Sequence, residues 1–68
     1  MAKSYDKQLG AFLRKQRGEL AYVKFAKKIG IGAGTLHRLE RAEQSITLGK
    51  LEDILNRLKC SLSDVFKD

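Results

Sequence analysis

The chain has 68 residues, of which 43% are hydrophobic and 32% are charged, and its formal net charge is +6. One cysteine and one histidine exclude an internal disulfide bond and a structural zinc site, and no apolar run is long enough to cross a membrane. We therefore expect a single cytoplasmic domain over residues 1–68, with a small core over about 5–66 and an N-terminal tail over 1–4.

Apolar residues recur at helical spacing, and no sustained alternation of apolar and polar residues favours strands. The first predicted helix runs from about Tyr5 to Arg17 and ends before Gly18. The second runs from about Ala21 to Ile29 and ends before Gly30, because glycine accepts the left-handed backbone of a helix C-terminus. The predicted apolar faces carry Leu9, Phe12, Leu13 and Gln16 on the first helix, and Tyr22, Phe25, Ala26 and Ile29 on the second.

The segment 32–35 has low helix propensity and leads into a third short helix over Leu36 to Arg41. After a polar link over 42–45, Thr47 is the predicted N-cap of a fourth helix. Ser61 begins a fifth helix, where Asp64 completes a partial capping box. The apolar faces carry Leu48, Leu51, Ile54, Leu55 and Leu58 on the fourth helix, and Leu62, Val65 and Phe66 on the fifth. The predicted fold is all-α, a compact bundle of five short helices.

The segment from Leu20 to Leu39 has the pattern of two helices that cross steeply. Ala26 offers a small side chain where the helices would touch, and Gly30 tolerates positive φ at the turn. Apolar residues that would lock the pair onto the core are Phe25, Ile29, Ile31, Leu36 and Leu39. This pattern indicates a helix-turn-helix, in which the second helix enters the DNA major groove.

A longer ordered set of residues extends this pattern over nearly the whole chain. It comprises Leu20, Phe25-Ala26, Ile29-Gly30-Ile31, Thr35-Leu36, Arg38-Leu39-Glu40-Arg41, Thr47-Leu48, Leu51 and the segment Cys60 to Phe66. From about Leu9 to Phe66 the chain thus resembles the Cro and phage-repressor (Xre-type) helix-turn-helix domains. The resemblance implies the five-helix fold of those DNA-binding domains, with the helix-turn-helix formed by the second and third helices.

The chain also departs from the usual residues of that family. Ala21 and Tyr22 replace Ser or Thr followed by Gln, so we expect the Tyr22 hydroxyl to supply the phosphate contact of the missing Gln. Ala42 replaces the usual Gly after the Glu-Arg pair, and Ile46 replaces the usual Pro before the fourth helix. If Leu9, Leu13 and Arg17 keep their family roles, the loop between the first two helices is two residues shorter than usual. With this alignment to the family, the resemblance implies a partly buried ion pair between Arg17 and Glu40.

The resemblance makes Gly32 to Arg41 the recognition helix with its leading turn. The base-reading candidates are Ala33, Gly34, Thr35, His37 and Arg38. Ala33 and Gly34 have no hydrogen-bonding side chain, so we expect Arg38 to make the main base contact and DNA shape to supply much of the specificity. The phosphate candidates are Tyr22, Lys24, Gly32, Arg41 and Arg14.

Structural roles compete with these assignments. Tyr22 could instead cover the edge of the core, and His37 fits a solvated helix position better than a DNA or metal ligand. Lys27 and Lys28 fit solvated side chains that add long-range attraction. Cys60 stands where the family usually has an aliphatic residue, which favours a buried, inert thiol.

The net positive charge comes entirely from the first half of the chain. Residues 1–30 hold eight basic and two acidic residues, whereas residues 31–68 hold six of each. Charge alone is compatible with a polyanionic partner or with a solubilising surface. With the motif, the predicted function is sequence-specific binding of double-stranded DNA by a small transcriptional regulator, such as a repressor, that occupies an operator. We expect a weak or DNA-assisted homodimer that uses the fifth helix (Leu62, Val65 and Phe66, each of which could also be core) or the link before the fourth.

The second function class is an antitoxin or adaptor whose main partner is a protein, such as a toxin or a polymerase, with DNA binding secondary. Salt dependence separates the two classes, because phosphate neutralisation makes affinity fall steeply with salt. A membrane-surface role lacks a long basic amphipathic helix. An enzyme is disfavoured because no nucleophile–base set is recognisable and the glycines at 30, 32 and 34 follow no strand. We expect no catalytic residue, cofactor or bound metal.

Overall fold

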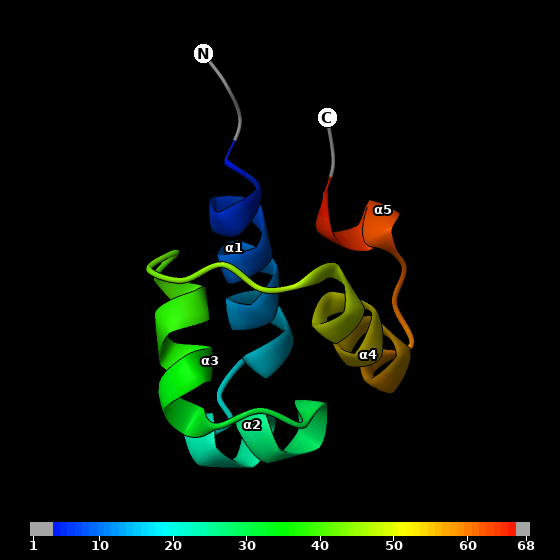
Figure 1. The fold of residues 1–68 in the computed structure, drawn as a ribbon. Helices are drawn as coiled ribbons and strands as arrows, with labels where there is room; N and C mark the ends of the chain where they lie inside the picture. The colour runs from blue at the N-terminus through cyan, green and yellow to red at the C-terminus, as the bar shows by residue number, and fades with distance from the viewer. Residues whose placement is uncertain (1–3, 67–68) are drawn as a thin grey trace.

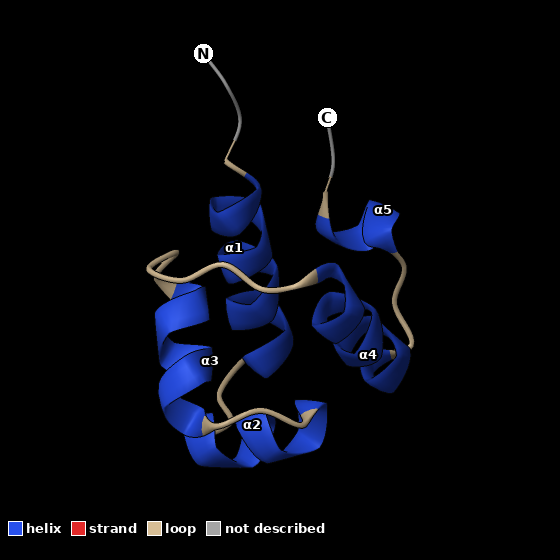
Figure 2. Cartoon of the chain, viewed as in Figure 1, coloured by secondary structure: helices blue, strands red, loops and turns tan. Residues whose placement is uncertain are grey.

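The computed structural model describes residues 4–66, which form five helices and no strand (Figure 1, Figure 2). In chain order the helices are α1 (Tyr5–Arg17), α2 (Tyr22–Ile29), α3 (Ala33–Glu40), α4 (Leu48–Leu58) and α5 (Leu62–Val65). The predicted all-α fold is confirmed. Within the described range, no helix combines the length and the apolar character that crossing a bilayer requires.

The ends of α1 and α2 follow local capping chemistry. Ser4, placed in the tail by the sequence pattern, is instead the N-cap of α1, because its Oγ accepts a hydrogen bond from the Lys7 backbone N–H at 3.2 Å. The rest of that tail, residues 1–3, lies outside the described residues. Gly18 ends α1 with φ at +57°, and Gly30 ends α2 with φ at +79°.

Helix α3 is the element whose bounds the sequence pattern placed wrongly. The structure begins it at Ala33, whereas the pattern began it at Leu36 and counted 32–35 as a leading segment. Ala33 packs against the core, Leu36 is fully buried, and the Leu36 N–H donates to the Gly32 carbonyl at 3.0 Å. Packing therefore outweighs the low helix propensity of Gly34.

The later helices begin where the sequence predicts. Thr47 Oγ1 accepts from the Lys50 N–H at 3.1 Å at the start of α4. Ser61 and Asp64 form a capping box at the start of α5, with the Ser61 N–H donating to Asp64 Oδ2 at 2.8 Å.

The core lies between α1, α2, α3 and α4, and α5 closes it against α1. Its buried hydrophobic residues are Leu9, Phe12, Leu13, Phe25, Ala26, Ile29, Leu36, Leu39, Leu51, Ile54, Leu55 and Val65. Three residues expected on apolar faces are exposed: Gln16, Leu48 and Leu62. Leu48 is 82% exposed because it is the first residue of α4, at an end of the helix that other elements do not cover.

One close helix contact positions α3. An added Cβ at Gly10 of α1 would lie 2.6 Å from the Leu39 carbonyl oxygen and 2.9 Å from that of Glu40. The two backbones therefore approach more closely than any side chain at residue 10 allows. In Figure 1, α2 lies at the end of the molecule opposite α5, and α3 runs along one side next to α1.

Candidate nucleic-acid interface

The turn between α2 and α3 is held by hydrogen bonds within it and from α4. The Ile31 N–H donates to the Ala26 carbonyl at 2.9 Å, which satisfies the end of α2. Lys50 Nζ of α4 donates to the Gly30 carbonyl at 2.9 Å, and an added Cβ at Gly30 would lie 2.9 Å from Cζ of Arg57. The sequence pattern missed the roles of Lys50 and Arg57, because nothing in it shows that α4 reaches this turn.

The start of α3 presents backbone to solvent. Gly32 is its N-cap, and the structure records no side-chain hydrogen bond to that cap within the described residues. Gly32 and Gly34 are exposed, Thr35 is half-buried, and Ala33 is half-buried against the core. Ala33 therefore offers less surface to a ligand than the sequence analysis expected, while the backbone N–H groups of the first turn stay accessible.

The exposed face of α3 carries Gly34, His37, Arg38 and Arg41 at helical spacing. The His37 ring contacts the Tyr22 ring edge-on, with centroids 5.3 Å apart, on the side of α2. On the side of the α3–α4 loop, Arg38 Nε donates to Gln44 Oε1 at 2.7 Å. The guanidinium of Arg38 lies beside Gly34, since an added Cβ there would be 3.6 Å from Nη1.

The phosphate candidates differ in how firmly they are held. Tyr22 is half-buried, with the Arg17 guanidinium 4.0 Å from its ring centroid, so its ring also has the structural role considered above. Lys24 is exposed, and Arg14 has 63% of its side chain exposed. Arg41 is exposed and pairs with Glu43, its Nε lying 2.9 Å from Oε2. The hydrogen bond to Glu43 and the charge of that carboxylate raise the pKa of Arg41.

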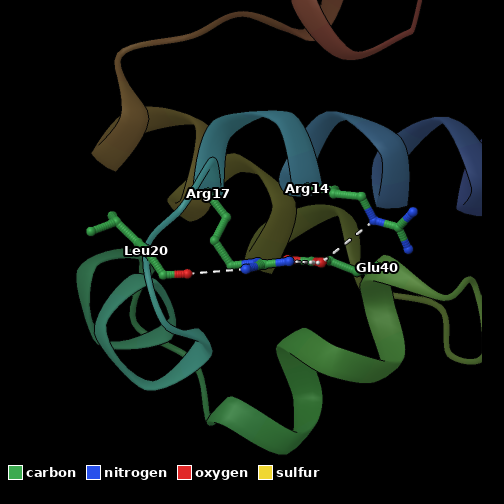
Figure 3. Close-up of polar contacts among 4 residues, drawn as sticks. All are labelled: Arg14, Arg17, Leu20 and Glu40. Atoms are coloured by element: carbon green, nitrogen blue, oxygen red, sulfur yellow. Dashed lines mark hydrogen bonds and ion pairs between the residues drawn. The ribbon is translucent and has the colours of Figure 1, made fainter.

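Arg17 and Glu40, assigned to each other by the resemblance, lie in contact (Figure 3). Arg17 Nε and Nη2 donate to the two Glu40 carboxylate oxygens at 2.7 and 3.1 Å, and Nη1 donates to the Leu20 carbonyl at 3.0 Å. The Glu40 side chain is fully buried, and Arg14 Nε lies 3.8 Å from its Oε1. The hydrogen bond to Glu40 is the main cause that raises the pKa of Arg17, against desolvation. The pair ties the end of α1 to the end of α3.

These contacts sort the site residues into two groups. Arg17, Tyr22, His37 and Glu40 form one connected cluster between α1, α2 and α3. Arg38 and Arg41 instead contact the α3–α4 loop, through Gln44 and Glu43. The sequence analysis missed both loop residues, because it counted 42–45 only as a polar link.

The three dimer candidates have different surroundings. Val65 is buried and belongs to the core, Phe66 is half-buried with its ring 5.2 Å from that of Tyr5, and Leu62 is 56% exposed. Next to Leu62 lies a hollow of about 490 Å³. Its lining residues are Tyr5, Asp6, Leu9, Ile46, Leu48, Leu51, Leu62, Ser63 and Phe66.

Cys60 is half-buried rather than buried, since it lies in the loop between α4 and α5 at the rim of the core. Its Sγ lies 3.5 Å from the Leu58 carbonyl oxygen. No group of three or more His, Cys, Asp or Glu side chains placed to hold a metal ion occurs within residues 4–66.

The helix-turn-helix family model matches residues 13–65, which include the end of α1 and all of α2 to α5. No curated protein and no solved structure matches the chain. The matched range contains the α2–α3 pair, the Arg17–Glu40 contact and the exposed face of α3.

Proposed function

The chain belongs to the Xre/Cro-type helix-turn-helix family of DNA-binding regulators, and from this premise we propose that it binds a specific operator in double-stranded DNA with α3 in the major groove. The observation that carries the proposal is the exposed face of α3. There Gly34 has no side chain to hold the backbone away from a ligand, and Arg38 lies beside it without a carboxylate partner among residues 4–66. A helix of this shape can approach base edges closely and present one guanidinium to them.

Base readout in this proposal depends mainly on Arg38. Thr35 and Ala33 contribute methyl groups that pack on a thymine methyl, Gly34 permits close approach, and His37 borders the face on the α2 side. Few side chains here can hydrogen-bond to bases. DNA shape therefore supplies a large share of the specificity.

Phosphate contacts flank this face. The accessible N–H groups after Gly32 and the positive end of the α3 dipole suit one phosphate. Tyr22, Lys24, Arg41 and Arg14 supply further contacts from α2, α3 and α1. The remaining basic residues of the first half add long-range attraction.

The protein acts in this proposal as a dimer whose second copy covers the apolar surface at α4 and α5. We define this surface by Tyr5, Leu48, Leu62 and Phe66, which border one hollow. A two-fold dimer of this kind places two α3 helices on half-sites about 34 Å apart on one face of the duplex.

Selection of bound sequences from a random DNA pool at two salt concentrations tests the proposal. We expect enriched sites with two-fold symmetry and half-sites about one helical turn apart, and affinity that falls steeply as salt rises. Arg38→Ala should remove the preference at one base pair of each half-site. Lys27→Ala, which also removes one exposed positive charge, should weaken binding to all sequences slightly and equally.

Absence of enrichment at both salt concentrations would overturn the proposal. The apolar surface at α4 and α5 would then indicate a protein partner instead, as in an antitoxin or adaptor. Binding of such a partner would change little with salt, because its energy comes from apolar burial.

A further inference from the structure

The α3–α4 loop folds back over the C-terminal end of α3. The Arg38 carbonyl accepts hydrogen bonds from the Arg41 N–H at 3.2 Å and the Glu43 N–H at 2.9 Å. Ala42, between them, has φ at +57° and donates its N–H to the Leu39 carbonyl at 3.1 Å. This loop conformation places Gln44, the residue after Glu43, alongside the Arg38 side chain.

The two arginines of this region have different partners. Arg41 pairs with the carboxylate of Glu43, which neutralises much of its charge locally. Arg38 instead donates from Nε to the neutral carboxamide oxygen of Gln44. Gln44 thus orients the guanidinium of Arg38 and leaves its positive charge available.

The guanidinium atom that Gln44 contacts determines which N–H donors of Arg38 remain available. A guanidinium has five N–H donors in a planar fork, and Nε contributes one of them. With Nε hydrogen-bonded to Gln44, the Nη1 and Nη2 groups remain available as donors. Nη1 lies beside Gly34 on the exposed face of α3. Two donors of this kind match the O6 and N7 acceptors on the major-groove edge of guanine.

We propose that Gln44 is a positioning residue that orients Arg38 for a guanine before DNA is bound, so that specificity at one G·C pair depends on a loop residue that need not touch the base. The inference rests on the proposed function and deepens it by naming the base and the residue that controls its readout. The physical reason is that a long side chain already held in its bound rotamer loses less conformational freedom on binding.

Sequence selection with one variant in α3 and two variants in the α3–α4 loop tests the inference. Arg38→Ala should lower the preference for guanine at its position about 10- to 100-fold, and Gln44→Ala should lower it about 3- to 10-fold while binding to other sequences stays unchanged. Gln44→Glu keeps an acceptor for Nε, so it should retain the preference while its added negative charge lowers affinity for all sequences.

Glu43→Ala is the matched control, because it removes the neighbouring acceptor in the same loop, which serves Arg41 rather than Arg38. It should raise affinity for all sequences and leave the guanine preference unchanged. A structural effect of loop substitution in general would instead change the preference in Glu43→Ala as well, and that result would overturn the inference.

A measurement without DNA reports on the contact itself. The Arg38 Nε–H resonance in the free protein should exchange slowly with water in the wild type and faster in Gln44→Ala. If the wild type selects an operator and Gln44→Ala keeps its full guanine preference, the positioning role is refuted and the proposed function stands. If the wild type selects no sequence, both fail.

Discussion

Ala42 has φ at +57°, a left-handed conformation that costs an L-residue with a Cβ roughly 1–2 kcal/mol. The family usually has glycine at this position, and the structure gives the reason. Residue 42 must turn the chain sharply so that the loop can return to the carbonyl of Arg38. The alanine therefore keeps the loop geometry at a cost in stability.

Ala42→Gly should increase the free energy of unfolding by about 0.5–1 kcal/mol, since relief of the strain exceeds the entropy that glycine adds to the unfolded chain. Chemical denaturation measures the change. Ala11→Gly, at an exposed position inside α1, is the control and should decrease stability by about 0.5–1 kcal/mol. If both variants lose stability equally, residue 42 does not have positive φ in solution.

The contact between Arg17 and Glu40 is asymmetric, because the Glu40 side chain is fully buried whereas 16% of the Arg17 side chain remains exposed. Arg17→Met should therefore destabilise the protein more than Glu40→Gln, since it leaves a buried carboxylate with only Arg14 nearby. The double variant should recover part of the loss of Arg17→Met, as measured by urea unfolding. Equal stabilities of Arg17→Met and the double variant would contradict the buried pair.

The raised pKa of Arg17 determines how the stabilisation from the Arg17–Glu40 contact depends on pH. A cationic group whose pKa is raised in the folded state stabilises that state fully at pH values below its unfolded-state pKa. This stabilisation is lost only as the pH rises through the folded-state pKa. For a guanidinium both values lie far above neutrality. The stability difference between the wild type and Arg17→Met should thus be the same at pH 7 and pH 9.

At the scale of elements, the orientation of α3 depends on how closely α1 approaches it. Gly10 is a position of close approach, because the three atoms nearest to an added Cβ there are backbone atoms of α3. Backbone cannot move aside as a flexible side chain can. The separation of α1 and α3 therefore depends on the absence of a Cβ at Gly10. The orientation of the exposed face of α3 depends on it as well.

Gly10→Ala should lower the free energy of unfolding by about 1–3 kcal/mol, because overpacking outweighs the helix propensity that alanine adds. Gly49→Ala in α4 is the control. Apart from its chain neighbours and the nearby backbone of α4, no described atom lies within 4 Å of the added Cβ. It should be neutral or stabilising by up to about 1 kcal/mol. Thermal unfolding separates the two, and an equal gain in both variants would contradict the close packing.

The elements also show which boundaries a single sequence can predict. The bounds of α1 and the starts of α4 and α5 were predictable because Gly18, Thr47 and Ser61 are strong local capping residues. The start of α3 was not, because Gly34 disfavours a helix and the burial of Leu36 and Leu39 overrides that preference. Burial is not visible in a window of neighbouring residues.

At the scale of the whole molecule, three of the five exposed large hydrophobic residues described lie around one hollow, namely Tyr5, Leu48 and Leu62, whereas Leu20 and Val23 lie elsewhere. Leu48 and Leu62 border the same hollow as Phe66 and Tyr5, and the hollow is lined by residues of α1, the α3–α4 loop, α4, α5 and the C-cap of α5. No lining residue of this hollow belongs to α2 or α3, so the proposed dimer would leave α3 uncovered.

Leu48→Ser should weaken dimerisation about 10-fold or more, since burial of a leucine contributes about 1.5–3 kcal/mol and a two-fold interface contains it twice. Sedimentation with and without operator DNA measures the change. Monomer stability should stay unchanged, because Leu48 is 82% exposed. Val23→Ser, which replaces another exposed apolar residue on α2, should leave association as it is. An equal effect of both variants would place the interface elsewhere.

The periodicity of apolar residues and the local capping residues predicted five helices, because each of these is a local property of the chain. The ordered set of residues that resembles the Xre/Cro-type domains predicted the family, which the family model then matched. The Arg17–Glu40 contact followed from the resemblance, but three other contacts that hold α3 and its flanking turn and loop were decided by tertiary structure alone. The Lys50–Gly30, Gln44–Arg38 and Gly10–Leu39 contacts join different elements. Each depends on how the helices and the loop pack in space. The net charge of +6 is compatible with a polyanionic partner. Packing decides that, within residues 4–66, Arg38 contacts the carboxamide of Gln44 whereas Arg17 and Arg41 contact carboxylates.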